Sequence, residues 1–293
     1  MLHVIINPTA GKGYPLTLLA QIRAELDRRG VEYAVMETEY PGHATELARR
    51  AAASGADVAA CGGDGTLCEA LCGLLGSQST LYIVPCGTGN DFIKAFYGLS
   101  RDPIQAFCQQ LDGQEILVDC GRFNQSAFLN VAGAGFDVEV LTQLVRFKDR
   151  GKGLKPYLYA VAAALRHFRP LVCEVELDGR VSSRCLTILS IANGQYIGGG
   201  MRVARDARLD DGLFDVLLVR RVPRFVIALL FPLFITGSFV RLPICEHVRC
   251  REVVVRARDM IVNVDGELHK AEEARFTLQP GSIRMRRPSF AKT

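Results

Sequence analysis

A glycine-rich turn at residues 62–65, which reads Gly-Gly-Asp-Gly, constrains this chain more than any other feature. The mostly apolar run 56–60 precedes the turn, and apolar residues at helical spacing follow it from Leu67 to Leu75. This pattern predicts a strand, a tight turn and the start of a helix, where backbone N–H groups and the helix dipole attract anions. Asp64 would repel a phosphate unless it holds a cation or accepts a proton. The turn therefore indicates phosphoryl transfer rather than passive phosphate binding.

Two further glycine turns follow apolar strand candidates. The run 81–84 leads into the turn 86–91, where Asn90 or Asp91 can cap the next helix. The first strand, 2–6, leads into the turn 7–13, where Lys12 could neutralise a phosphate. This last turn is not a Walker loop, because a glycine stands at position 13 where that motif needs Ser or Thr. Open α/β sheets bind ligands at the carboxyl ends of their strands, so the three turns are expected at one edge.

The alternation of strand and helix patterns divides the chain. Up to about residue 111 the two patterns alternate, which predicts a parallel sheet covered by helices. Beyond residue 113 the chain is mostly short strand candidates, interrupted by a helical pattern at 158–168, which favours an antiparallel sandwich. We therefore predict an α/β domain at 1–115 and a β-rich antiparallel domain at 116–279.

Composition is that of an ordinary globular protein, with 49% hydrophobic and 23% charged residues among 293 and a net charge of +4. The ten cysteines include no Cys-x-x-Cys, and the chain starts with a strand pattern rather than a signal peptide. A reducing cytoplasm is the expected compartment. We expect no nucleic-acid partner, and a monomer and a homodimer both stay open.

The most apolar stretch, 225–235, is interrupted by Pro232 and is too short to span a bilayer. Arginines at 220, 221 and 224 precede it. Such a segment either packs on its own domain, which is the default, or lies on an anionic membrane surface. The basic stretch 146–155 is a second candidate for contact with a membrane or a phosphate. We expect a cytoplasmic protein that associates peripherally with the membrane.

The order of the motifs resembles the catalytic domain of diacylglycerol kinases, and more narrowly the bacterial soluble lipid kinases related to sphingosine kinase. The resemblance covers nearly the whole chain. It rests on Asn7-Pro8 with Gly11-Lys12, on the segments 62–66 and 85–92, and on the later segments 193–200, 209–212 and 265–267.

This resemblance implies an ATP-dependent kinase that phosphorylates a lipid hydroxyl, with diacylglycerol and its product phosphatidic acid as the first candidates. It implies a nucleotide-binding first domain that residues 280–293 complete, and a lipid-binding second domain. Thr66 and Glu69 also fit a capping box, which would explain both residues structurally. The residues expected near ATP are Asn7, Lys12, Thr38, Gly62, Gly63, Asp64, Gly65, Thr66, Glu69, Thr88 and Asn90.

The same resemblance implies a structural Mg²⁺ held by Asp211 and by the backbone oxygens of Arg208 and Leu213. Oxygen donors of this kind suit magnesium. It also implies that Glu267 is the proton acceptor, with Asp64 as the second catalytic carboxylate. Asp265 lies so near in sequence that a shared or exchanged role stays open.

Two other functions remain as alternatives. A soluble nucleotide kinase of the NAD kinase type also uses a Gly-Gly-Asp-Gly-Thr turn, but the segment 87–92 fits lipid kinases better. A non-enzymatic lipid-binding regulator with a degenerate kinase fold is the second alternative. Against it, no residue expected to take part in the chemistry is missing.

Overall fold

The computed structural model describes residues 1–124, 126–147 and 155–289, so the basic stretch 146–155 lies outside the described residues except at its ends. The chain divides into two compact units. Unit 1 comprises Met1–Cys120, Leu209–Asp211 and Gln279–Thr293, and unit 2 comprises Gly121–Arg208 and Gly212–Leu278.

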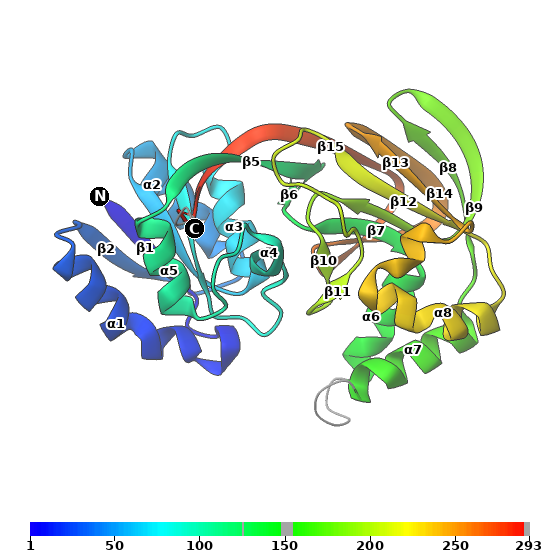
Figure 1. Ribbon diagram of the computed structural model, residues 1–293, viewed down its shortest axis with the longest axis horizontal. Helices are drawn as coiled ribbons and strands as arrows, with labels where there is room; N and C mark the ends of the chain where they lie inside the picture. Colours follow the sequence, from blue (N-terminus) through cyan, green and yellow to red (C-terminus); the bar gives the residue numbers. More distant parts are fainter. Residues whose placement is uncertain (125, 148–154, 290–293) are drawn as a thin grey trace. The chain divides into compact units, whose positions relative to one another are not determined.

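A parallel sheet forms the centre of unit 1. Its strands run in the order β2-β1-β3-β4, with Val4 of β1 opposite both Val35 and Ala59. Helices α1 and α5 cover one face of the sheet, and α2 and α3 cover the other (Figure 1). The elements are β1 (Leu2–Ile6), α1 (Tyr14–Arg28), β2 (Tyr33–Glu37), α2 (His43–Ala53), β3 (Asp57–Gly62), α3 (Asp64–Leu74), β4 (Thr80–Pro85), α4 (Asp91–Ala95) and α5 (Pro103–Leu111).

The last strand of the chain, β15 (Glu267–Arg287), contributes to both units. Its final residues pair in parallel with β4, where Arg284 lies opposite Thr80 and Met285 opposite Leu81. Met285 is fully buried. The C-terminal segment therefore adds a fifth parallel strand to the sheet of unit 1.

Antiparallel strands dominate unit 2. Strand β9 (Arg180–Ala192) pairs with β8 (Leu171–Leu177) through its first half and with β7 (Val131–Gly135) through its second half. Strand β14 (Glu252–Val264) pairs with the same two strands, and a bulge between Arg256 and Met260 bends it. The other strands are β5 (Gln114–Phe123), β6 (Ser126–Phe128), β10 (Tyr196–Ile197), β11 (Met201–Arg202), β12 (Phe214–Arg220) and β13 (Cys245–Cys250).

Three helices of unit 2 pack on one side of its strands: α6 (Phe136–Phe147), α7 (Lys155–His167) and α8 (Arg224–Thr236) (Figure 1). Phe136 of α6, Ala164 of α7 and Ile227 of α8 share a buried cluster with residues of β9 and β12. A second cluster, which includes Phe128, Phe214 and Phe276, fills the space between the strands.

The structure confirms the predicted fold class, an α/β domain followed by a β-rich antiparallel domain. Helix α6 is absent from the sequence prediction. It begins directly after β7, whose glycine-rich end resembles a turn, and Gly135 has a φ of +113°. Within the described residues, no helix is long and apolar enough to cross a membrane.

Candidate active site

The three glycine turns meet at the carboxyl edge of the sheet in unit 1. A Cβ on Gly87 would lie 2.5 Å from Cα of Gly63, and a Cβ on Gly11 would collide with the carbonyl oxygen of Cys86. Gly11 also has a φ of +51°, which glycine adopts without strain. Glycine is therefore required where the backbones of the turns approach each other.

Asn7 and Thr66 connect the first turn to the second. The Nδ2 group of Asn7 donates a hydrogen bond to Oγ1 of Thr66 at 2.9 Å, and Oδ1 of Asn7 accepts one from the N–H of Thr9 at 3.0 Å. Gly62 packs so closely against Thr66 that a Cβ there would lie 2.5 Å from Oγ1. The two side chains therefore hold the turns in place, whatever else they contact.

Asp64 is the first residue of α3, and its carboxylate reaches the next turn. Oδ1 accepts a hydrogen bond from the N–H of Phe92 at 3.3 Å, at the start of α4. Burial raises the pKa of the Asp64 carboxyl, while the N–H groups of Asp91 and Phe92 act to lower it. Asp64 thus has a structural role at α4 that the sequence analysis did not consider, beside the expected cation or proton role.

Asn90 closes the turn that follows β4. Its side chain accepts a hydrogen bond from the N–H of Gly87 at 3.0 Å and donates one to the carbonyl oxygen of Gly87 at 2.8 Å. Its φ of +49° is one that asparagine tolerates better than most residues. Asn90 stands at the N-cap position of α4 but makes no side-chain cap bond, so Asp64 supplies the cap that Asn90 or Asp91 was expected to supply.

The predicted capping box of Thr66 and Glu69 is wrong. Helix α3 begins at Asp64, so both residues lie inside the helix rather than at its start. Oε2 of Glu69 instead accepts a hydrogen bond at 3.2 Å from the N–H of Ala44, in the first turn of α2. Glu69 therefore joins two helices on one face of the sheet.

The remaining residues expected near ATP lie at the same edge. Lys12 and Thr88 are exposed in the turns after β1 and β4, and Thr38 follows β2. Gly65 is exposed too, and nothing lies within 4 Å of where its Cβ would stand. The edge thus offers open space beside the first turn of α3.

The three expected magnesium ligands lie in one loop before β12. The adjacent Leu209 carbonyl oxygen accepts a hydrogen bond from the N–H of Asp119 at 2.7 Å, and Oδ1 of Asp119 accepts one from Gly281 at 2.7 Å. No cluster of three or more His, Cys, Asp or Glu side chains suited to a metal occurs among the described residues. Asp211 with the backbone oxygens of Arg208 and Leu213 is an all-oxygen donor set, which fits Mg²⁺.

The hairpin between β14 and β15 places its two carboxylates, Asp265 and Glu267, in different surroundings. The Asp265 carboxylate accepts hydrogen bonds from the backbone N–H groups of residues 129–131 at 2.8–3.0 Å, so it anchors the turn between β6 and β7. The Glu267 side chain is 80% exposed, with Oε2 3.9 Å from Nε2 of His269. Asp265 is used in holding the fold, whereas Glu267 is accessible.

Comparisons with known proteins decide the family. Residues 1–123 match the model of the diacylglycerol kinase catalytic domain, and residues 130–287 match that of the YegS C-terminal NAD kinase beta sandwich-like domain. The chain is 30% identical over 291 residues to a diacylglycerol kinase of Mycobacterium tuberculosis (strain H37Rv), covering 97% of this chain and 94% of the relative. The chain belongs to the diacylglycerol kinase family.

Other members of this family of lipid kinases are similar over most of their length. The chain is 28% identical over 269 residues to a diacylglycerol kinase of Bacillus subtilis (strain 168), covering 90% of this chain and 89% of that one. A crystal structure of a diacylglycerol kinase from Bacillus anthracis matches with a TM-score of 0.78 and 26% identity, covering 98% and 96% of the two chains. Membership in this family favours a lipid kinase over the NAD kinase alternative.

This diacylglycerol kinase family member has an apolar cavity in unit 2 that the sequence analysis missed. Asp137, near the start of α6, is the one carboxylate among the cavity's described lining residues. Its Oδ1 is buried with no hydrogen-bond partner among the described residues, and burial raises the pKa of Asp137 to about 6. No sequence motif marks this site. The lining residues are Phe136, Asp137, Val140, Ile188, Ser190, Ile197, Met201, Val203, Phe231, Phe234 and Phe239.

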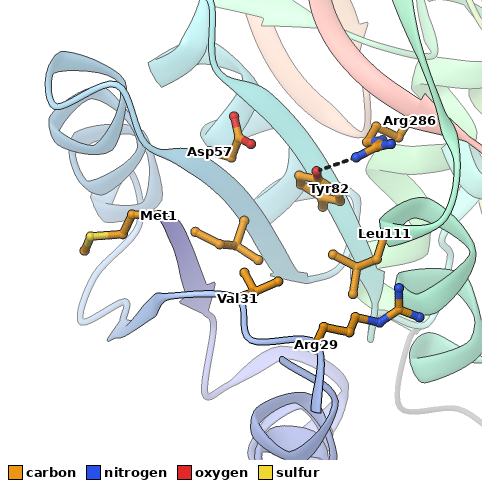
Figure 2. A pocket seen from close by; sticks show the side chains of 8 residues that line it. Met1, Arg29, Val31, Asp57, Tyr82, Leu111 and Arg286 are labelled. Atoms are coloured by element: carbon orange, nitrogen blue, oxygen red, sulfur yellow. Dashed lines mark hydrogen bonds between the residues drawn. The ribbon is translucent and has the colours of Figure 1, made fainter. Parts of the chain in front are cut away.

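A further cavity lies in unit 1, at the edge opposite the glycine turns, where β1 and β3 begin (Figure 2). Arg29 is paired with Glu25 and Asp112, and Arg286 donates to the carbonyl oxygen of Gly113 and, at 3.5 Å, to the hydroxyl of Tyr82. Because both arginines of its lining already have partners within the unit, we do not assign this cavity to the active site.

Proposed function

We propose that the protein transfers the γ-phosphoryl group of ATP to the hydroxyl of a lipid, and that the lipid is diacylglycerol. Phosphatidic acid is then the product. The observation that carries this proposal is the meeting of three glycine turns at one sheet edge, with a partly buried carboxylate, Asp64, among them. The names of the relatives support diacylglycerol as the acceptor.

The carboxyl edge of the sheet is the proposed nucleotide site. The helix α3 begins beside the open space at Gly65, and the backbone N–H groups of its first turn would bind phosphate oxygens. Lys12 would add a positive charge there. Mg²⁺ bound to the phosphates would neutralise charge that develops on them. Asp64 would help to position the Mg²⁺ and the phosphates, while its carboxylate continues to cap the start of α4.

Glu267 is the proposed general base. Its exposed carboxylate is free to take the proton of a lipid hydroxyl as the phosphoryl group moves. Asp265 would act as a positioning residue, because its carboxylate already accepts three backbone N–H groups. These contacts favour Glu267 over Asp265 as the base, a choice that the sequence leaves open.

The cavity of unit 2 is the proposed site for an acyl chain of the lipid. Aromatic and aliphatic side chains dominate its lining, and apolar cavities of this kind bind apolar ligands. Phe231 and Phe234 of α8 form one wall, so movement of α8 would change the size of the cavity.

A structural Mg²⁺ on Asp211 is the proposed second ion of the protein. The loop that would hold it is fastened to β5 through the bond between Leu209 and Asp119. An ion there would stabilise this loop rather than take part in the chemistry. We further propose that the protein works in the cytoplasm and at the membrane surface where its lipid substrate resides.

The test is an assay with ATP labelled in the γ-phosphate, in which the purified protein meets a panel of lipids in detergent micelles, with NAD alongside. We expect label in phosphatidic acid and none in NADP. Label in NADP would establish the NAD kinase alternative. Binding of diacylglycerol with no transfer to any acceptor would support the non-enzymatic regulator instead.

A further inference from the structure

Helix α8 turns an apolar stripe to solvent. Phe225 is 72% exposed and Leu229 is 74% exposed. Ala228 and Pro232, which are also exposed, continue the stripe at spacings of three and four residues, which places all four side chains on one face. Single exposed apolar residues are common, but a continuous stripe of them indicates a surface that contacts something.

Helix α7 carries a second stripe of the same kind. Leu158 is 48% exposed and Tyr159 is 53% exposed, and the exposed Ala162 follows at helical spacing. The Arg224 guanidinium, at the start of α8, donates hydrogen bonds to the carbonyl oxygens of Arg166 and Phe168 at 2.9 and 2.8 Å. The end of α7 is therefore fixed to the start of α8, and the two stripes lie on neighbouring helices (Figure 1).

Arginines flank α8 along the chain, and neither α7 nor α8 contains an acidic residue. Between Asp215 and Glu246 the chain contains four arginines and no acidic residue. Arginines 220, 221 and 224 lie before or at the start of α8 and Arg241 lies after its end, and none of the four pairs with a carboxylate within the described residues. Helix α7 contains Lys155 and Arg166 and no acidic residue.

We propose that the stripe of α8, with the stripe of α7 beside it, docks this protein on a bilayer that contains anionic phospholipids. An exposed apolar helix with arginines before and after it fits such a surface, because the apolar side chains can enter the acyl boundary while the guanidinium groups meet the phosphates. With 13 residues, α8 is too short to span the bilayer and would lie in its plane.

The reason for such docking rests on the proposed function, in which the protein takes its lipid substrate from a membrane. The inner side of α8 supplies Phe231 and Phe234 to the apolar cavity, while its outer side carries Phe225 and Leu229. Docking through the outer side would bring the wall of the cavity to the surface in which diacylglycerol is dissolved.

Vesicle sedimentation of the full chain tests the surface. We expect the wild type to bind vesicles made of equal parts of phosphatidylcholine and phosphatidylglycerol, to bind pure phosphatidylcholine weakly, and to lose affinity as salt is added. The double variant Phe225→Ser with Leu229→Ser should bind about tenfold more weakly or worse. The charge variant Arg221→Glu with Arg241→Glu should lose about as much and become less sensitive to salt.

The matched control removes apolar side chains elsewhere in unit 2. Val172 and Val181 are 73% and 57% exposed on β8 and β9, so Val172→Ser with Val181→Ser should leave vesicle binding unchanged. Equal binding of the wild type and the α8 stripe variant would overturn the proposal, and so would equal binding to neutral and anionic vesicles. A stripe variant that only splits a dimer, seen by light scattering, would assign the stripe to a second copy of the chain.

A short-chain, water-soluble diacylglycerol separates this inference from the proposed function. The stripe variant should phosphorylate it at the wild-type rate. If no form phosphorylates it while vesicle binding follows the expected pattern, the proposed function fails and the docking surface stands. If the wild type phosphorylates it and the stripe variant still sediments like the wild type, the docking surface fails alone.

Discussion

The sheet edge of unit 1 is formed mainly by the main chain, whereas the cavity of unit 2 is formed by side chains. At the edge, three turns of backbone approach so closely that Gly11 and Gly87 have no room for a side chain, and a Cβ on Gly63 would lie only 3.2 Å from Cα of Gly87. The cavity is formed instead by large side chains from helices and strands far apart in the sequence, among them Phe136, Ile188 and Phe234.

This difference follows from what each region is proposed to bind. Phosphate oxygens need N–H donors at fixed positions, and a rigid turn supplies them from the main chain. An acyl chain needs only apolar surface of the right shape, which many combinations of side chains can supply. The edge should therefore respond sharply to small changes, and the cavity only to changes in volume or charge.

The largest effect should come from the hairpin carboxylates. Glu267→Gln keeps the shape and removes the basicity, so kcat should fall about a thousandfold while ATP binding is unchanged. Asp265→Asn should be the milder change in kcat, because its carboxylate faces backbone donors. Steady-state kinetics and nucleotide titrations on both variants decide the matter. An inactive Asp265→Asn beside a normal Glu267→Gln would show that the wrong carboxylate was chosen.

The next effect concerns the polar edge itself. Asp64→Asn should lower kcat about a hundredfold, or about 3 kcal/mol, because the negative charge is lost. The fold should survive, since the amide oxygen can still accept the N–H of Phe92. Burial raises the pKa of Asp64, so the wild-type rate should begin to fall, as pH is lowered, at a pH above that of an ordinary aspartate. Wild-type turnover in Asp64→Asn would remove this residue from the chemistry.

In the cavity, Asp137 should make stability depend on pH. Its folded-state pKa of about 6 lies above the ordinary value of 3.8, so the unfolded chain loses this proton first as pH rises. Asp137 therefore lowers stability progressively between about pH 4 and pH 6, by at most about 3 kcal/mol. Relative to the wild type, Asp137→Asn should become more stable across this window. The measurement is the free energy of unfolding of both proteins at several pH values. If the difference between Asp137→Asn and the wild type is the same at every pH, the raised pKa is contradicted.

A smaller effect should distinguish two glycines of the edge. Gly87→Ala would place a Cβ 2.5 Å from Cα of Gly63, so the turns must separate, and unfolding should become easier by about 1–3 kcal/mol. Gly65→Ala is the matched control for stability, because nothing lies within 4 Å of its Cβ position. Thermal melting of both variants is the measurement. Equal melting temperatures would mean that the turns are not packed as described.

The sequence predicts the edge of unit 1 better than the cavity of unit 2. The edge is built from local turns, whereas the cavity is built from side chains that lie far apart in the sequence. Glycine turns after apolar strands leave a local pattern, so the edge, the parallel sheet and Asp64 can be predicted from the residues alone. The role of Asp64 as a cap for α4 and the contact of Glu69 with Ala44 cannot, because both depend on how separate turns and helices pack. The cavity cannot be predicted either, because its lining residues have no common spacing in the sequence. Its carboxylate, Asp137, looks in the sequence like any acidic residue in the first turn of a helix.

The most direct test of the division between edge and cavity is steady-state kinetics with both substrates varied. Gly65→Val fills the open space beside α3, and Val203→Phe fills part of the cavity. We expect Gly65→Val to raise KM for ATP about tenfold or more with KM for diacylglycerol unchanged, and Val203→Phe to do the reverse. If Gly65→Val raises only KM for the lipid, or Val203→Phe only KM for ATP, the two regions have been assigned to the wrong substrates.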